Sequence, residues 1–403
     1  MFRKVNKVHF VGIGGIGMSG IAELLLNLGF SVSGSDLNDS EIIRNLRSKG
    51  AMIYEGHYAK NLGDCEVLVY SSAVPEDNPE LIAARGKNVP IIKRAEMLGE
   101  LIALKQTSIG VGGTHGKTST SSMIGALLSY AQLDPTLVVG GLVKNIDTNS
   151  QLGSGDIIVV EADEYDKSFL QLKPTISVIT NIEQEHMDCY DDLEDLHKSF
   201  AQFANAVPFY GAVLACLDSP GVQDIIPSIK RPVITYGFTS QADISAKNIQ
   251  SKGTKTTYSL YKQNQKCGKV TLNVPGKHNV LNSLAAAAIG FEMGLSAKTV
   301  IAGIGSYGGV RRRFEIKGIA GDVMVVDDYA HHPTEVSATL QAARGGWDRR
   351  IIAVFQPHLF SRTKSFYKEF AAAFMDSDVL IVTDIYPARE KPIKGVTGKL
   401  VSN

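Results

Sequence analysis

The sequence predicts an α/β protein built from three domains. Short runs rich in β-branched residues alternate with longer helical patterns along the whole chain, which is typical of βαβ units and parallel sheets. The length of 403 residues suits two or three domains at about 150 residues each. Breaks in the pattern place these domains at residues 1–105, 106–310 and 311–403.

The composition excludes several classes of protein. Hydrophobic residues make up 44% of the chain, and 41 basic residues balance 41 acidic ones. Disorder is therefore excluded, and no basic excess is left to neutralise a nucleic acid backbone. The four cysteines are scattered without a CxxC pair, and neither a signal peptide nor an 18-residue apolar run is found. We expect a soluble, cytoplasmic protein without nucleic-acid or membrane partners.

The first segment begins with a strand at 8–11, a glycine turn and a helix near 19–28, followed by strands around 31–34 and 66–70. The turn reads GIGGIG, so Gly12, Gly14 and Gly17 match the G-x-G-x-x-G pattern of Rossmann-like folds. In that pattern the glycines and the helix N-terminus bind a pyrophosphate. Asp36 ends the next strand, where an acid could bind a ribose. NAD and a UDP-sugar fit this loop equally well, and a purely structural turn is the alternative.

The second segment carries another glycine loop, between a strand at 108–111 and a helix at 118–130. Its GTHGKT sequence resembles a P-loop, in which Lys117 would reach the β- and γ-phosphates and Thr118 would bind Mg²⁺. The usual spacing fails because the first glycine of the motif falls on Val111. Strands at 157–160 and 176–180 lead into acidic clusters that contain Glu161 and His186, which could be cation ligands or solvated loop residues. The polar stretch 243–274 predicts an antiparallel addition to this domain.

The third segment is predicted to run strand, helix, strand, helix, strand. Its strands are expected at 323–326, 351–355 and 379–383, with helices after Pro333 and near 363–375. A polar stretch then ends the sequence, whereas a doubly wound sheet usually continues and is covered on both faces. We therefore expect a Rossmann-like but truncated C-terminal domain, with part of one sheet face uncovered.

Two nucleotide-binding loops in consecutive domains favour a ligase. A dehydrogenase needs one dinucleotide site and no ATP site, and an ATPase motor needs no second nucleotide fold. A ligase that activates one substrate with ATP, while holding it by a nucleotide handle, needs both. A non-catalytic nucleotide-binding regulatory protein is the alternative from another class.

Eight stretches, in this order along the chain, resemble the Mur ligase family of peptidoglycan synthesis: HFVGIGGIGMSG, GGTHGKTST, EADEYDKSFL, TNIEQEHMD, GKHNVLNSLAA, RRRFE, DDYAHHPTEV and FQPHLFSRT. The first loop is similar to that of the alanine-adding members, since the recycling members that attach a tripeptide depart from GIGGIGM. The resemblance implies that ATP and Mg²⁺ drive the joining of L-alanine to the lactyl carboxylate of UDP-N-acetylmuramate through an acyl phosphate. Another muropeptide ligase is the alternative within the family.

The resemblance also implies a role for each site. The UDP-sugar would bind at Gly12, Gly14, Gly15, Ile16, Gly17, Asp36, Ser71 and Ser72. ATP would bind at Gly113, Thr114, His115, Gly116, Lys117, Thr118, Ser119, His278, Asn279 and Asn282. The magnesium ligands would be Thr118, Glu161 and His186, and the catalytic set would be Lys117, Glu161, His186, Arg313 and Asp328. L-alanine would bind at His331, His358 and Arg362.

Two departures from the family pattern stand out. Leu359 occupies the place of a second arginine, so the carboxylate of the amino acid would depend more on Arg362. Lys198 lies in the region where sister ligases carry a carbamylated lysine, but its spacing from His186 does not support that role. Apart from the resemblance, His331 and His332 could equally be two exposed loop histidines.

Overall fold

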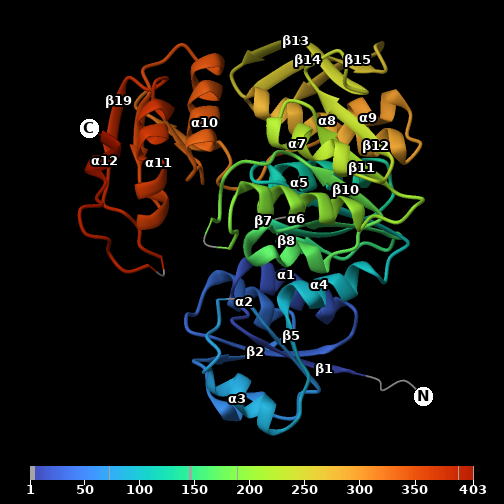
Figure 1. Cartoon of the computed structure of the whole chain (residues 1–403), viewed down its shortest axis with the longest axis vertical. Helices are drawn as coiled ribbons and strands as arrows, with labels where there is room; N and C mark the ends of the chain where they lie inside the picture. The colour runs from blue at the N-terminus through green and yellow to red at the C-terminus, as the bar shows by residue number, and fades with distance from the viewer. Residues whose placement is uncertain (1–4, 72, 145–147, 188, 389, 403) are drawn as a thin grey trace.

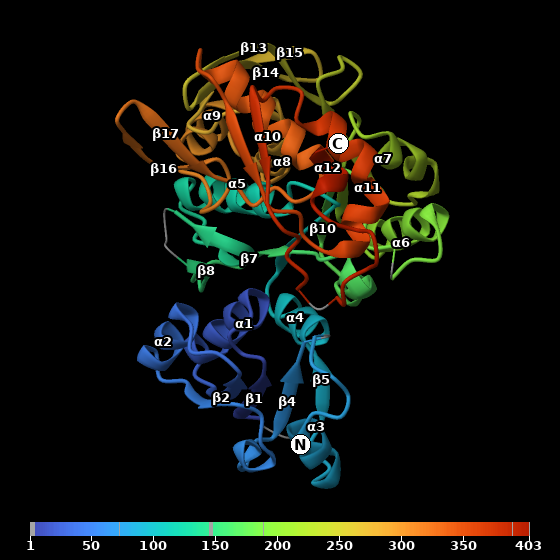
Figure 2. The ribbon, with the colours of Figure 1, turned by 90° about the vertical axis from the view of Figure 1, so that its left-hand side faces the viewer.

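The computed structural model describes residues 5–71, 73–144, 148–187, 189–388 and 390–402. Figure 1 shows three units, with the N-terminal unit below, the central unit above it and the C-terminal unit beside the central one. Figure 2, turned so that the C-terminal unit faces the viewer, shows this unit in front of the central one and above the first. No helix among these described residues is long and apolar enough to cross a bilayer.

The first unit is a five-stranded parallel sheet in the order β3-β2-β1-β4-β5. Its elements are β1 (Lys7–Val11), α1 (Ile16–Asn27), β2 (Ser31–Asp36), α2 (Glu41–Ser48), β3 (Met52–Glu55), a 3₁₀ turn (Ala59–Leu62), β4 (Val67–Tyr70), α3 (Pro79–Gly86), β5 (Ile91–Lys93) and α4 (Arg94–Ile102). Helix α1 begins three residues before the predicted start at 19, because the extended Gly15 ends the glycine turn and leads directly into it. This order is that of a Rossmann-like doubly wound sheet without a sixth strand, and a Rossmann-like fold is what the sequence predicts.

The central unit contains a mixed ten-stranded sheet in the order β15-β14-β13-β12-β11-β10-β6-β9-β7-β8. Its strands are β6 (Thr107–Gly112), β7 (Thr136–Val143), β8 (Thr148–Gln151), β9 (Ile157–Glu161), β10 (Ile176–Ile179), β11 (Ala212–Cys216), β12 (Val233–Gly237), β13 (Ile244–Lys252), β14 (Lys255–Lys262) and β15 (Gln265–Leu272). Its helices are α5 (Lys117–Tyr130), α6 (Leu193–Asn205), α7 (Pro220–Ile225), α8 (Lys277–Glu292) and α9 (Ala297–Gly305), with 3₁₀ segments at Tyr165–Gln171 and Ile226–Ser228. Strands β13, β14 and β15 pair antiparallel, which confirms the addition predicted for 243–274.

The central sheet is buried on both faces. Along β9, Ile157 and Val159 enter one hydrophobic core, while Ile158 and Val160 enter another, as the two-residue period of a strand requires. The first core contains side chains of α5, α8 and α9. The second contains side chains of α6 and α7 and continues into the first unit, where α1 packs against β7 and β8. The P-loop strand is therefore fixed between two rigid layers.

The strands of the C-terminal unit pair two by two in the described part of the chain. Its elements are β16 (Glu315–Ala320), β17 (Val323–Asp327), α10 (Pro333–Gly346), β18 (Ile352–Phe355), α11 (Phe360–Ala373), β19 (Val379–Val382) and α12 (Lys399–Ser402). β16 and β17 form an antiparallel hairpin, and β18 and β19 form a parallel pair. β16 was not predicted, because its residues are largely polar or exposed and lack the apolar run of a buried strand.

One face of the β18–β19 pair is exposed. The side chains of Ile352, Val354 and Ile381 are 56%, 67% and 49% exposed. The alternate residues Phe355 and Val382 pack with α10 and α11 in a small separate core. The apolar strands β18 and β19 are thus covered by helices on one side.

Candidate active site

The second glycine loop lies at the carboxyl end of β6, between this strand and α5. β6 pairs with β9 on one side and β10 on the other, so the ends of three parallel strands meet at the loop. Gly113 has a φ of +136°, and a Cβ at this position would collide with the Thr180 hydroxyl. Gly116 has a φ of +81° and immediately precedes α5. Both glycines are therefore required by the turn that presents the helix N-terminus.

The segment after β10 holds this loop in place. The backbone N–H of Thr114 donates to the Asn181 carbonyl at 3.0 Å, and that of His115 donates to Asn181 Oδ1 at 2.8 Å. In return the Glu183 N–H donates to Thr114 Oγ1 at 2.9 Å. These hydrogen bonds fix the TNIE and GTHGKT stretches relative to each other.

Lys117 lies within an acidic environment at the start of α5. Its Nζ is 2.6 Å from Glu164 Oε2 and donates to the Gly113 carbonyl at 2.6 Å. Burial opposes the charge, but Glu164, Asp163 and Glu161 together raise the pKa of Lys117 well above its ordinary value. The ammonium therefore stays charged, and in this structure it is paired with Glu164.

The predicted magnesium ligands fall into two neighbouring groups. Thr118 Oγ1 donates to Glu161 Oε2 at 2.9 Å, so this hydroxyl and carboxylate form the first group. His186 belongs to a second group with Glu164 and Glu185, whose ligand atoms lie within 4.8 Å of one another. Lys117 connects the two groups, because it is hydrogen-bonded to Glu164 and directly precedes Thr118 in the chain.

Both groups have the chemistry that a hard cation needs. Glu164 Oε1 is buried and accepts no hydrogen bond within the described residues, although it lies 3.7 Å from His186 Nε2. Burial lowers the pKa of His186, so its ring is neutral and can act as a ligand. Carboxylate and hydroxyl oxygens, with a single imidazole, suit Mg²⁺ when phosphate and water complete its octahedron.

The glycine loop of the first domain faces the central domain across a cavity of about 380 Å³. Gly15, Ile16, Gly17 and Ser71 line the cavity on one side, and Gly140, Glu161 and Asp163 line it on the other. Asp36 does not line this cavity, since its Oδ2 accepts a hydrogen bond from the Gly14 N–H at 2.9 Å and thereby shapes the loop. Ser72 lies outside the described residues.

Arg94 was not predicted as a site residue, but it lines the same cavity. It begins α4, and its Nη2 is 3.2 Å from Asp163 Oδ2. A Cβ on Gly17 would lie 3.0 Å from Arg94 Nη1, so the guanidinium lies directly over the glycine loop. This places a fixed cation where the loop would present a pyrophosphate.

A second cavity, of about 270 Å³, lies between the central and C-terminal domains. Residues predicted for ATP that line it are His115, Gly116, Ser119, His278, Asn279 and Asn282, and Arg313 and Asp328 of the predicted catalytic set line it as well. Burial and the nearby Arg313 lower the pKa of His278 to about 4, so its ring is neutral. Asn282 Oδ1 accepts a hydrogen bond from Thr120 Oγ1 at 3.1 Å, which ties α8 to α5 beside the P-loop. Six of the ten residues predicted for ATP therefore line one cavity, whereas Gly113, Thr114, Lys117 and Thr118 do not line it.

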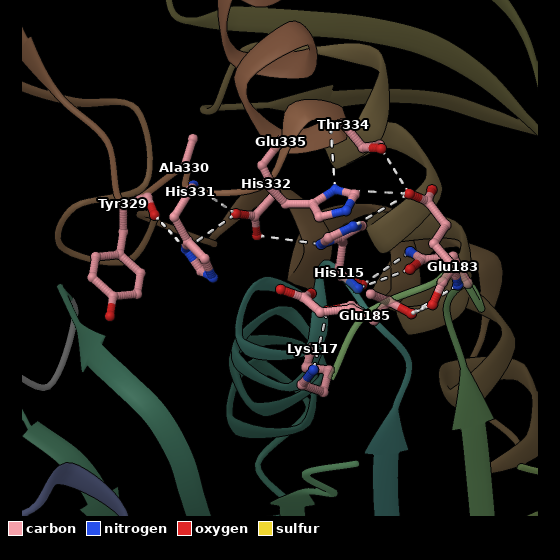
Figure 3. A network of polar contacts seen from close by, with 12 residues as sticks. His115, Lys117, Glu183, Glu185, Tyr329, Ala330, His331, His332, Thr334 and Glu335 are labelled. Atoms are coloured by element: carbon pink, nitrogen blue, oxygen red, sulfur yellow. Dashed lines mark hydrogen bonds and ion pairs between the residues drawn. The ribbon is translucent and has the colours of Figure 1, made fainter. Parts of the chain in front are cut away.

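The C-terminal domain reaches the P-loop through two carboxylates (Figure 3). Glu335 on α10 lies 3.5 Å from His115 Nδ1. It also lies 3.3 Å from Arg313 Nη1. Glu183 of the central domain lies 3.4 Å from His115 Nε2 and accepts a hydrogen bond from Thr334 Oγ1 at 2.6 Å. Burial opposes the charge on His115, but Glu183 and Glu335 raise its pKa to about 9. His115 is thus a cation held between carboxylates of two domains.

The three residues predicted for the amino acid lie close together. The rings of His331 and His358 have centroids 6.0 Å apart, and Arg362 Nη1 is 3.2 Å from His358 Nδ1. Arg362 also forms a buried ion pair with Glu185, at 2.6 Å, across the domain boundary. This arginine, predicted to bind the carboxylate of the amino acid, is therefore already paired with Glu185.

Several residues at the site were not predicted. Glu183, Glu185 and Glu335 hold the C-terminal domain against the P-loop, and the available signal for Glu335 was its place three residues after the helix N-cap His332. His332 is buried rather than exposed and caps α10. Lys198 is an exposed residue of α6 that pairs with Glu194 at 2.7 Å, so it does not reach the site.

The fold and the site define a class of protein: a three-domain protein in which a P-loop of the central domain lies near the glycine loop of a Rossmann-like first domain, with a cavity between the two domains. Three family models match the chain: "Mur ligase family, catalytic domain" over residues 7–106, "Mur ligase middle domain" over 111–290 and "Mur ligase, glutamate ligase domain" over 312–401. The chain belongs to the Mur ligase family.

Relatives of known name and structure agree with this assignment. The chain is 52% identical over 402 residues to a UDP-N-acetylmuramate–L-alanine ligase of Geotalea daltonii, covering 100% of this chain and 88% of the relative. It is 53% identical over 399 residues to the enzyme of the same name from Syntrophus aciditrophicus, and the match covers 99% of this chain and 83% of that relative. The crystal structure of UDP-N-acetylmuramate–alanine ligase from Thermotoga maritima superimposes with a TM-score of 0.83 at 30% identity, covering 94% of this chain and 85% of that one. The crystal structure of a murein peptide ligase from Psychrobacter arcticus gives a TM-score of 0.76 at 25% identity, and the match covers 98% of this chain and 87% of that one.

Proposed function

We propose that this chain is an ATP-dependent ligase that joins L-alanine to the lactyl carboxylate of UDP-N-acetylmuramate in peptidoglycan precursor synthesis. One observation carries the proposal. The glycine loop of the first domain and Glu161, which accepts from the P-loop Thr118, line the same cavity of about 380 Å³. A sugar held by its UDP group at Gly15–Gly17 would therefore direct its carboxylate toward the P-loop.

The first chemical step is the transfer of the γ-phosphoryl group of ATP to that carboxylate. Adenosine would occupy the cavity lined by His278, Asn279 and Arg313, and the triphosphate would follow the loop to Lys117. The main barrier is electrostatic, because a carboxylate has to approach a triphosphate. The charged Lys117 offsets part of this repulsion, and Arg94 offers a further cation over the UDP-binding loop.

Magnesium would be held by Thr118 and Glu161 in one group and by Glu164, Glu185 and His186 in the other. When bound, Mg²⁺ neutralises phosphate charge and helps to align the phosphoryl group for transfer. The chain itself holds these donors on the ends of β9 and β10 and at the start of α5, which are fixed by the central sheet.

The second step is attack by the amine of L-alanine on the acyl phosphate. His331, His358 and Arg362 lie on the C-terminal domain, which contacts the P-loop through Glu335 and His115. The amino acid would therefore be brought to the acyl phosphate by the same domain contact that closes the nucleotide cavity.

A tripeptide-adding ligase is the second candidate, and it is less well supported. The relatives near 50% identity carry the alanine-adding name, whereas the murein peptide ligase is 25% identical. The GIGGIGM loop also favours the alanine-adding branch.

The test is release of inorganic phosphate with ATP, Mg²⁺ and UDP-N-acetylmuramate against a panel of L-alanine, glycine, L-serine and a muropeptide tripeptide. We expect turnover that requires both the UDP-sugar and L-alanine, and loss of turnover by orders of magnitude in Lys117→Ala. A preference for the tripeptide would indicate that the chain is a tripeptide-adding ligase of the recycling branch. Binding of both nucleotides without any phosphate release would support a regulatory role instead.

A further inference from the structure

Glu335 contacts both the P-loop and the proposed amino-acid site (Figure 3). Its Oε1 lies 3.5 Å from His115 Nδ1 and 3.3 Å from Arg313 Nη1. Its Oε2 accepts a hydrogen bond from the His331 N–H at 3.1 Å and lies 3.3 Å from His331 Nδ1. The carboxylate therefore links the nucleotide residues to a histidine of the proposed amino-acid site.

These contacts determine which nitrogen of His331 carries a proton. Nδ1 lies 2.9 Å from the Tyr329 carbonyl oxygen and also faces Glu335 Oε2. A carbonyl and an ionised carboxylate only accept hydrogen bonds, and the cations around Glu335 hold its pKa well below the ordinary value despite burial. Nδ1 is therefore the donor, which leaves Nε2 as the ring nitrogen that can take up a proton.

The neighbouring His358 has the opposite arrangement. Its Nδ1 lies 3.2 Å from Arg362 Nη1, and a guanidinium only donates hydrogen bonds. Burial, with the nearby Arg362, lowers the pKa of His358, so its ring is neutral and Nε2 carries the proton. The two rings, 6.0 Å apart, thus offer one acceptor and one donor.

This pair matches the two charged groups of an amino acid. We propose that His331 Nε2 is the general base that takes a proton from the ammonium group of the amino acid, that Glu335 is the residue that positions it, and that His358 Nε2–H donates to the carboxylate. The inference rests on the proposed function, because it assigns roles within the second step of that reaction.

The proton and electron balance of this step is simple. The ammonium gives one proton to His331 Nε2, which leaves a neutral amine with a lone pair. The amine nitrogen forms a bond to the acyl carbon, and the bond from that carbon to the phosphate oxygen breaks, with its electron pair leaving on phosphate. The second amine proton passes to the departing phosphate, and His331 returns its proton to water.

Hydroxylamine separates this role from the first chemical step. It is largely unprotonated at neutral pH, so it traps an acyl phosphate as a hydroxamate without a general base. The experiment measures two products for each variant at pH 7.5, with ATP, Mg²⁺ and UDP-N-acetylmuramate: the hydroxamate with hydroxylamine, and the amide with L-alanine. The ratio of amide to hydroxamate then reports the activation of the amine.

His331→Asn keeps a donor near the position of Nδ1 and removes Nε2. We expect amide formation to fall on the order of 100-fold, while hydroxamate formation stays within about twofold of wild type. Glu335→Gln is expected to lower the same ratio less strongly, by about tenfold, through kcat more than through the KM for L-alanine. Glu335→Asp, which keeps a carboxylate, should lower the ratio of amide to hydroxamate less than Glu335→Gln does. The matched control is Glu183→Gln, which removes a neighbouring contact between the same domains without touching His331, and it should leave the ratio unchanged.

Each alternative outcome has a separate meaning. If wild type forms neither product, the proposed function itself fails. If wild type forms both, and His331→Asn keeps the wild-type ratio, the base assignment is wrong. If His331→Asn loses both products, imidazole is added to His331→Ala: recovery of the amide supports the base, and no recovery overturns it.

Discussion

The ion pair between Arg362 and Glu185 lies across the boundary of the central and C-terminal domains, and it allows a quantitative prediction. Their side chains are 8% and 6% exposed, and the two atoms are 2.6 Å apart. Burial opposes ionisation of Glu185, but Arg362 and neighbouring histidines lower its pKa from 4.5 to about 2. At about 1.4 kcal/mol for each pH unit, this difference corresponds to about 3 kcal/mol.

Arg362→Met removes the partner and leaves a buried carboxylate without compensation. We expect the free energy of unfolding of the C-terminal domain to fall by about 3 kcal/mol at pH 7, in the range known for a broken buried pair. Because the folded pKa of Glu185 is depressed, the contribution is complete above pH 4.5 and is lost as the pH falls toward about 2. The difference between wild type and variant should therefore shrink below pH 4.5.

The assay uses the single tryptophan of the chain. Trp347 lies in the C-terminal domain and stacks on Phe314, with ring centroids 5.3 Å apart. Its fluorescence in a urea titration therefore reports the unfolding of this domain. Equal urea midpoints for wild type and Arg362→Met at pH 7 would refute the reasoning. The double variant Glu185→Gln/Arg362→Met is the control, and it should recover part of the loss because no charge is left buried.

The other predictions concern the two glycine loops and the domain contact. Gly14→Val would place a Cβ 2.9 Å from Asp36 Oδ2, so calorimetry should show weaker binding of the UDP-sugar with unchanged binding of ATP; an equal loss of both would indicate misfolding. Glu161→Gln and His186→Ala should each raise the Mg²⁺ concentration for half-maximal activity on the order of tenfold, and normal magnesium titrations would remove both from the metal site. His115 has a pKa raised to about 9, so its stabilising contribution is complete below pH 6.5 and is lost as the pH rises through 9. Tryptophan fluorescence in urea at pH 7 and pH 10 should show this loss in wild type, and a His115→Asn variant should lack it.

Local patterns were sufficient to predict the architecture and both glycine loops. The loops follow short apolar strands and precede helices, and this order depends on residues close together in the chain. The antiparallel addition at 243–274 was predicted for the same reason, since alternation is a local property.

Contacts between distant residues could not be predicted in the same way. Glu185 and Arg362 are separated by 177 positions, and Glu183 and Thr334 by 151. Nothing local marks a glutamate in TNIEQEH as the partner of one arginine on α11. The hydrogen bond from the Gly14 N–H to Asp36 could not be predicted either, because an acid at the end of β2 can bind a ribose or the backbone of its own loop.

The exposed apolar face of β18 and β19 has a practical consequence for handling the protein. The side chains of Ile352, Val354 and Ile381 form a small exposed apolar surface. The chain has no net charge near its isoelectric point of about 7.1. Molecules without net charge repel one another weakly, so apolar patches meet more often at neutral pH. We expect the protein to be least soluble near pH 7 and to concentrate best in a buffer one or two pH units away. Val354→Lys, on the exposed face of the pair, should weaken this pH dependence.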